Sequence, residues 1–140
     1  MLDIQKIDHI GIRVRDKDRS VAFYESLGFT MLRDIGFDQG HPVMMKNASN
    51  VVLNILGPSS ESRDENILMD VEDKRYAGYT HIALRVASIK QAEDLFNELG
   101  YPITGRMSFN GLQGIFIRDP DRNVIEFDAY DEPQTEIRRQ

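Results

Sequence analysis

The chain of 140 residues contains no cysteine, which excludes disulfide bonds, thiolate metal ligands, iron–sulfur clusters and cysteine nucleophiles. It has no apolar run near the roughly 20 residues that a membrane-spanning helix needs. Basic residues are in the minority, and the net charge of −6 argues against a nucleic-acid partner. The first residues lack the charged-then-apolar order of a signal peptide, so we expect a cytoplasmic protein. Any bound metal must use histidine and oxygen ligands.

What the chain does have is an internal repeat. Apolar residues make up 41% of the sequence, an ordinary share for a globular domain with its own core. Several pairs of segments align without a gap at one offset of 72 residues, and three of them are Ile7–Val14 with Tyr79–Val86, Ala22–Phe29 with Asp94–Tyr101, and Val51–Ile55 with Asn123–Phe127. Several matches at one offset indicate two copies of one supersecondary unit.

Each copy predicts a strand, a helix and then three strands. Alternating apolar residues in Ile7–Arg15 predict the first strand, and Asp16 is a favourable N-cap for a helix that ends near Leu27. In the second copy Ser88 opens a capping box, and Gly100 suits the end of the helix. Further strands are expected at about residues 30–36, 42–47, 51–56, 102–107, 113–118 and 123–129.

This order predicts an α+β protein. The domain covers residues 1–140 and consists of two βαβββ modules, at about 5–57 and 79–129, joined by a linker at 58–78. Two copies are too few for a solenoid, so we expect a paired, pseudo-symmetric domain.

One face of the predicted sheets collects polar residues that can bind a metal. Side chains alternate across a strand, so His9 and Asn54 in the first copy lie opposite the apolar residues, as do His81 and Glu126 in the second. A histidine taken alone is more often structural, but the repeat places these two at equivalent positions. Two imidazoles and one carboxylate suit a divalent ion such as Zn, Ni, Co, Mn or Fe. Asn54 would supply a weak amide oxygen or none.

Other residues on this face are candidates for binding a substrate. Arg13 and Arg85 would bind a carboxylate through the fork of the guanidinium, and an ordinary solvated role fits them equally well. Met44 and Phe116 occupy equivalent strand positions and would form an apolar wall, with core packing as the alternative. The third histidine, His41, precedes a proline in a predicted loop, and we expect it at the surface.

Four segments resemble the vicinal oxygen chelate superfamily, which includes glyoxalase I, extradiol dioxygenases, fosfomycin-resistance proteins and bleomycin-binding proteins. The segments that carry the resemblance are Asp8–Val14, Phe23–Phe29, Tyr79–Leu84 and Phe116–Phe127. The resemblance implies that the two modules pair into a curved mixed sheet around a metal-binding cavity. It also implies that the ligand positions are His9, Asn54, His81 and Glu126.

The resemblance implies an enzyme that chelates a small oxygenated substrate on the metal. Glyoxalase I typically has a second glutamate where Asn54 stands, and an amide cannot accept a proton, so Glu126 would serve as both ligand and base. A glyoxalase-like lyase or isomerase is the favoured function. One alternative is an Fe(II)-dependent extradiol-type dioxygenase, although its signature has a tyrosine where Phe116 stands. The second alternative is a drug-binding resistance protein.

The expected partners follow from the same features. We expect a small-molecule substrate, no nucleic acid and no membrane. We also expect a homodimer. The two modules would pair either within one chain or by exchange between two chains.

Overall fold

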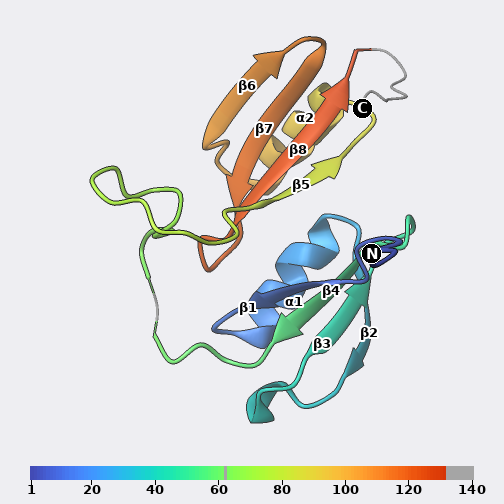
Figure 1. The fold of residues 1–140 in the computed structure, drawn as a ribbon, viewed down its shortest axis with the longest axis vertical. Coiled ribbons are helices and arrows are strands. Elements are labelled where there is room, and N and C mark those ends of the chain that lie inside the picture. The colour runs from blue at the N-terminus through green and yellow to red at the C-terminus, as the bar shows by residue number, and fades with distance from the viewer. Residues whose placement is uncertain (62, 132–140) are drawn as a thin grey trace. The chain divides into compact units, whose positions relative to one another are not determined.

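The computed structural model of the chain describes residues 1–61 and 63–131. The chain divides into two compact units, residues 1–64 and 65–140, and each is described by itself (Figure 1). Each unit is a four-stranded mixed sheet with one α-helix, so the α+β class and the two βαβββ modules are confirmed. Among the described residues, no helix combines the length and the apolar character that crossing a membrane requires.

The first unit has the sheet order β1-β4-β3-β2. Strand β1 runs parallel to β4, and the other neighbours are antiparallel. Helix α1 follows β1 and contacts β2 and β4. The elements are β1 (Ile10–Arg13), α1 (Lys17–Ser26), β2 (Thr30–Asp34), the short 3-10 helix η1 (Phe37–Gln39), β3 (Val43–Lys46) and β4 (Val52–Leu56).

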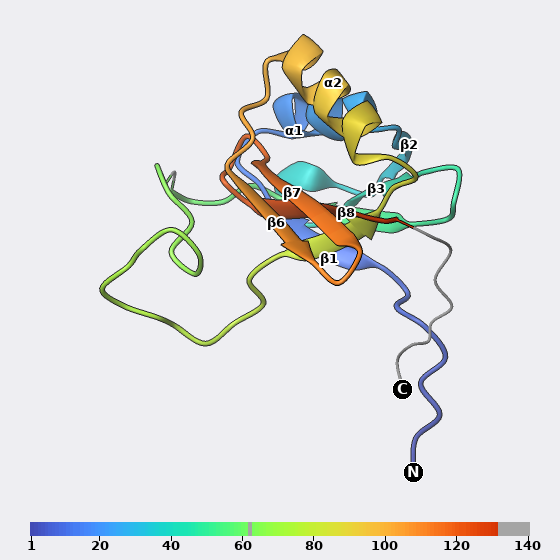
Figure 2. The same cartoon turned by 90° about the horizontal axis from the view of Figure 1, so that it is seen from above.

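The second unit repeats this topology with the sheet order β5-β8-β7-β6. Strand β5 is parallel to β8, as β1 is to β4. Helix α2 lies against one face of this sheet, which is visible in two views (Figures 1 and 2). The elements are β5 (Ile82–Arg85), α2 (Ile89–Leu99), β6 (Gly105–Phe109), β7 (Leu112–Arg118) and β8 (Val124–Tyr130).

Both helices begin where the sequence predicts. The Asp16 carboxylate accepts a hydrogen bond from the Arg19 backbone N–H at 2.9 Å, and the Ser88 hydroxyl accepts one from the Gln91 N–H at 3.1 Å. Each bond satisfies a donor that the first turn of a helix leaves free. Gly100 ends α2 with φ of 76°, a left-handed conformation that glycine adopts at little cost.

A separate apolar core forms between the helix and the sheet of each unit. In the first unit, α1 contributes Phe23 and Tyr24, whose rings meet edge to face at 5.0 Å. In the second unit, Phe96 of α2 packs on Phe127 of β8 with ring centroids 5.0 Å apart. The alternation along the strands leaves the opposite face of each sheet for polar side chains, and this face carries the predicted site residues.

Part of the predicted linker packs on the second unit. The Asn66 side-chain amide donates to the Arg122 carbonyl at 3.1 Å, and Asp70 forms an ion pair with Arg118 at 2.7 Å. The Arg118 guanidinium holds the pKa of the Asp70 carboxyl below its usual value. Residues 66–70 are therefore fixed against the end of β7 and the turn that leads into β8.

Candidate functional site

His81 and Glu126 are brought together in the second unit. His81 immediately precedes β5, and Glu126 lies in β8, where its Cα pairs with Ala83 of β5. The His81 Nε2 atom is 2.8 Å from Glu126 Oε1. Glu126 is buried, with 7% of its surface exposed, so its negative charge depends on a nearby partner. The imidazole of His81 supplies that partner.

The His81 ring is held on two further sides. Its Nδ1 atom is 2.8 Å from the hydroxyl oxygen of Thr80. Phe116 of β7 meets the ring edge-on, with ring centroids 5.8 Å apart. Phe116 is also the ladder partner of Glu126, so the aromatic ring flanks the imidazole and lies one strand away from the carboxylate. The structure thus places Phe116 beside His81 and Glu126.

Asp128 is a second carboxyl beside Glu126 that the sequence analysis does not include among the site residues. Glu126 and Asp128 are two residues apart in β8, so their side chains share one face of the strand. Burial, together with the neighbouring Glu126 carboxyl, raises the pKa of Asp128 to about 7. The Asp128 Oδ1 atom is buried and receives no hydrogen bond from the described residues. The sequence signal that identifies it is the two-residue spacing from Glu126, which strand alternation places on the same face.

Gly114 of β7 makes room for this carboxyl pair. Gly114 is the ladder partner of Asp128. A Cβ atom at position 114 would lie 2.7 Å from Asp128 Oδ1 and 3.3 Å from Glu126 Oε2. The first distance is shorter than any ordinary contact, so a larger residue would displace the carboxyls.

In the first unit the equivalent positions are His9 and Asn54. His9 immediately precedes β1, its side chain is 46% exposed, and its Nδ1 atom is 2.8 Å from the Asp8 carboxylate. Asn54 lies in β4 opposite Gly11 of β1. The Asn54 side-chain oxygen is buried and, within residues 1–61 and 63–131, accepts no hydrogen bond. A buried amide oxygen without a donor is costly, and a cation or a ligand donor would satisfy it.

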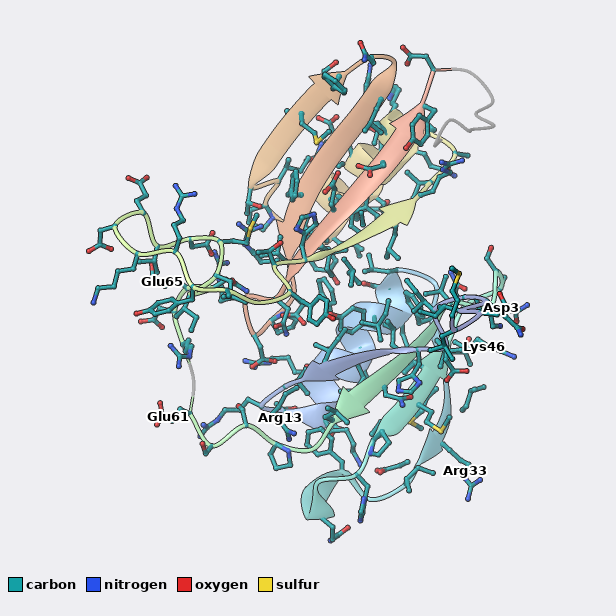
Figure 3. All side chains as sticks on the ribbon, viewed as in Figure 1. Asp3, Arg13, Arg33, Lys46, Glu61 and Glu65 are labelled. Carbon is teal, nitrogen blue, oxygen red and sulfur yellow. The ribbon has the colours of Figure 1, made fainter. Side chains whose placement is uncertain are left out.

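The two predicted arginines each make one contact in their own unit. Arg13, at the end of β1 (Figure 3), donates from Nη1 to the Gly57 carbonyl at 2.8 Å. The Arg85 guanidinium lies over the Tyr130 ring, 4.3 Å from its centroid. Met44 of β3 is half-buried opposite Asn54. Substrate binding by these residues and by Phe116 stays a prediction.

The chain matches a family model over most of its length. Residues 6–127 match the family model of the Glyoxalase/Bleomycin resistance protein/Dioxygenase superfamily. The chain belongs to this superfamily. The match spans both units and includes His9, Asn54, His81 and Glu126, the four positions that the resemblance assigns to the metal.

Individual relatives of the superfamily are distant in sequence. The chain is 22% identical over 129 residues to a glyoxalase domain-containing protein of Mycosarcoma maydis, covering 92% of this chain and 70% of that protein. It is 29% identical over 128 residues to a virulence protein of Salmonella typhimurium, covering 91% and 85%. The fosfomycin resistance protein FosX of Listeria monocytogenes has a similar fold, with a TM-score of 0.68 at 18% identity over 91% of this chain and 93% of that one.

Members of this superfamily generally bind a divalent metal, and the donors in this chain fit one. Two ligand atoms at right angles, each about 2.1 Å from one ion, lie about 3 Å apart. The 2.8 Å between His81 Nε2 and Glu126 Oε1 is close to that separation. In the described part of the chain no three His, Asp or Glu residues are grouped as a metal site, and the predicted ligands are divided between the two units.

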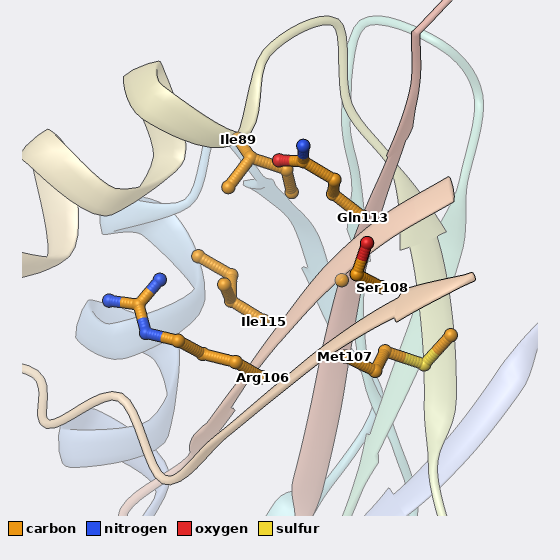
Figure 4. Close-up of a pocket in the computed structure, with 7 residues that line it drawn as sticks. Ile89, Arg106, Met107, Ser108, Gln113 and Ile115 are labelled. Atoms are coloured by element: carbon orange, nitrogen blue, oxygen red, sulfur yellow. The ribbon is translucent and has the colours of Figure 1, made fainter. Parts of the chain in front are cut away.

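A cavity of about 340 Å³ lies elsewhere in the second unit, between the start of α2 and strands β6 and β7 (Figure 4). It is lined by Ile89, Arg106, Met107, Ser108, Gln113, Gly114 and Ile115. None of the predicted site residues lines it, and its lining contains no histidine or carboxyl side chain. Gly114 is both a lining residue and a neighbour of the carboxyl pair.

Proposed function

We propose that the protein is a divalent-metal-dependent enzyme that acts on a small oxygenated substrate. His9, His81 and Glu126 would hold the ion, and Asn54 would add a weak amide oxygen. The observation that carries the proposal is the 2.8 Å approach of an imidazole nitrogen and a buried carboxylate oxygen on one sheet face. The buried Asn54 oxygen without a donor supports it from the other module.

The favoured reaction is of the glyoxalase type, a lyase or an isomerase. A divalent ion would act as a Lewis acid toward two neighbouring substrate oxygens. Glu126 is the predicted ligand suited to accept a substrate proton, since Asn54 is an amide and a histidine that binds the ion with one nitrogen keeps a proton on the other. Its burial removes water from the carboxylate, which strengthens its interaction with a nearby charge. Asp128, with its pKa near neutrality, would hold or release a proton beside it.

Residues of both modules would orient the substrate. Phe116 and Met44 would offer apolar contact on either module. Arg13 and Arg85 would bind an anionic group, because each guanidinium has five N–H donors and the contacts above use only part of them. A screen of small molecules with adjacent oxygen atoms would identify the substrate.

The direct test is metal content together with anaerobic turnover. Purified protein should carry or bind about one divalent ion per chain, and Glu126→Gln and His81→Ala should each abolish turnover of a hydroxycarbonyl substrate. His41→Ala is the matched control, because His41 is exposed and lies outside the predicted ligand set.

The same experiment separates the alternatives. Turnover without oxygen in the presence of Zn, Ni or Co would exclude an Fe(II)-dependent dioxygenase, whereas strict dependence on iron and oxygen would establish it. If the protein binds no metal, and His9→Ala leaves its affinity for a drug unchanged, the protein is a drug-binding protein and the proposed enzymatic function is wrong. We further propose that the protein is cytoplasmic and forms a homodimer.

A further inference from the structure

Both predicted histidine ligands are held in the same way by the residue that precedes them. The His9 Nδ1 atom is 2.8 Å from Asp8 Oδ2, and the His81 Nδ1 atom is 2.8 Å from Thr80 Oγ1. Asp8 and Thr80 are 72 residues apart, so they occupy equivalent positions in the internal repeat. Two separate modules with different side chains therefore make the same contact to the same ring nitrogen.

This contact decides which nitrogen is available to a metal. An imidazole that binds an ion uses one nitrogen as a ligand, and the other keeps its proton and donates a hydrogen bond. A proton on Nδ1, donated to Asp8 or Thr80, leaves the Nε2 lone pair for the ion. In the second unit Nε2 is the atom that lies 2.8 Å from Glu126 Oε1, so a bound ion would take the place of the proton that the two atoms share in this contact.

We propose that Asp8 and Thr80 are paired positioning residues for the metal, each fixing the orientation and the tautomer of the histidine that follows it. The inference rests on the proposed metal-dependent function and deepens it. It adds two residues that do not touch the ion, and it explains why the residues before the two histidines are polar in both copies of the repeat.

The two positioning residues act with different strength. Asp8 is an anion, and its charge-assisted bond makes the His9 ring a better electron donor to a cation. Thr80 is neutral and only partly exposed, and it orients His81 without adding charge. The Asp8 side chain is 89% exposed, so its bond to His9 contributes little to folding. A loss of metal affinity in an Asp8 variant would thus not reflect an unfolded protein.

The test measures the affinity of the full-length, metal-stripped protein for Zn²⁺ by calorimetry and for Co²⁺ by its visible absorption. Thr80→Val keeps the shape of the side chain and removes the oxygen, and it should weaken binding by about tenfold to 100-fold. Thr80→Ser keeps a hydroxyl and should restore the affinity to nearly that of the wild type. Asp8→Ala should weaken binding more than Thr80→Val does, because it also removes the negative charge. Asp8→Asn should bind more weakly than the wild type and more tightly than Asp8→Ala, because its amide oxygen still accepts from Nδ1.

Two controls separate positioning from general effects. Asp3→Ala removes one negative charge from the same N-terminal segment and should leave the affinity unchanged. Thermal unfolding of the metal-free variants should match that of the wild type, which shows that a weakened site is not a damaged fold.

The outcomes distinguish this inference from the proposed function. If the wild type binds the ion and both Thr80→Val and Asp8→Ala bind it equally well, the positioning role is wrong and the metal site stands. If the wild type binds neither ion, both proposals fail. If Thr80→Ser binds as poorly as Thr80→Val, the hydroxyl is not the group responsible, and the inference is also overturned.

Discussion

At the scale of single residues, the central feature is a pair of carboxyls on one face of β8. Two carboxylates that touch repel each other, so one of them keeps a proton. Here Glu126 is the more buried residue and faces the His81 imidazole, whereas Asp128 faces Gly114 across the ladder. The proton therefore belongs mainly on Asp128, whose pKa is raised to about 7 by burial and by the Glu126 carboxyl.

The pH dependence of stability should report this proton. Because the folded state raises the pKa of Asp128 from 3.8 to about 7, the native protein binds more protons than the unfolded chain between these values. Stability should fall as the pH rises through this window. Asp128→Asn removes the titrating group and should flatten that part of the profile. The neighbours His81, Arg85 and Glu126, which also act on this pKa, are retained in the variant.

The measurement is urea unfolding of the metal-free wild type and Asp128→Asn at about pH 5 and about pH 8. The wild type should lose more unfolding free energy between the two pH values than the variant does. Identical losses would show that Asp128 titrates in the folded protein as it does in the unfolded chain.

Gly114 should be sensitive to the smallest substitution. In Gly114→Ala the new methyl group would lie 2.7 Å from Asp128 Oδ1 and 3.3 Å from Glu126 Oε2, so the Asp128 carboxyl must shift beside Glu126. Overpacking of this kind costs about 1–3 kcal/mol, and metal affinity should fall with it. Gly11→Ala is the control, because its Cβ would meet its nearest atom, Leu56 Cδ1, at an ordinary 3.6 Å. Equal effects of the two substitutions on stability and Zn²⁺ affinity would contradict this explanation.

The sequence predicted which polar residues share a sheet face better than it predicted their immediate contacts. Strand alternation and the repeat were sufficient to place His81 and Glu126 on one face, and the structure brings them within 2.8 Å. The role of Asp128 and the contacts of Thr80 and Asp8 depend on side-chain rotamers and on the space left by a glycine one strand away. The alternation of residues along a strand carries no information on side-chain rotamers or on the space beside a glycine.

At the scale of elements, the start of each helix was predicted from its cap, and the strand bounds were less accurate. The strand expected at 102–107 is observed as β6, Gly105–Phe109. Pro102 has no N–H to give to a ladder, so the chain joins β7 only after it, with Thr104 donating to the Phe116 carbonyl. The strand expected at Ile7–Arg15 is limited to Ile10–Arg13, the residues that have partners in β4. The short helix η1 was not predicted.

The Ser88 cap should make a measurable contribution to stability. Ser88→Ala removes the acceptor for the Gln91 N–H and should lower the unfolding free energy by about 1 kcal/mol. Ser88→Gly should cost less than this, a few tenths of a kcal/mol. Urea unfolding of the two variants beside the wild type measures both differences. A loss for Ser88→Ala no larger than that for Ser88→Gly would show that the hydroxyl does not cap α2.

At the scale of the whole molecule, two units with one topology share a single proposed function. The order β1-β4-β3-β2 is repeated as β5-β8-β7-β6, and each unit contributes part of the predicted ligand set. His9 and Asn54 belong to the first unit, and His81 and Glu126 belong to the second, so the metal centre that we propose would draw its ligands from two modules, of one chain or of two. This is why an oligomeric state matters to the chemistry.

Members of the superfamily commonly dimerise, and we expect a dimer here. Sedimentation equilibrium of the full chain, at micromolar concentration, should give twice the mass of 16.1 kDa. Removal of the metal should shift the equilibrium toward the monomer if the two chains share ligands, because the ion then links them. A protein that sediments only as a monomer would contradict the dimer and leave the metal site within one chain.

The proposed metal centre can be tested by a crystal structure of the protein grown with Co²⁺ or Zn²⁺, with the ion located by its anomalous scattering. We predict one ion about 2.1 Å from the Nε2 atoms of His9 and His81 and from a carboxylate oxygen of Glu126. An ion bound elsewhere, or two histidines that bind separate ions while Glu126 binds none, would contradict it.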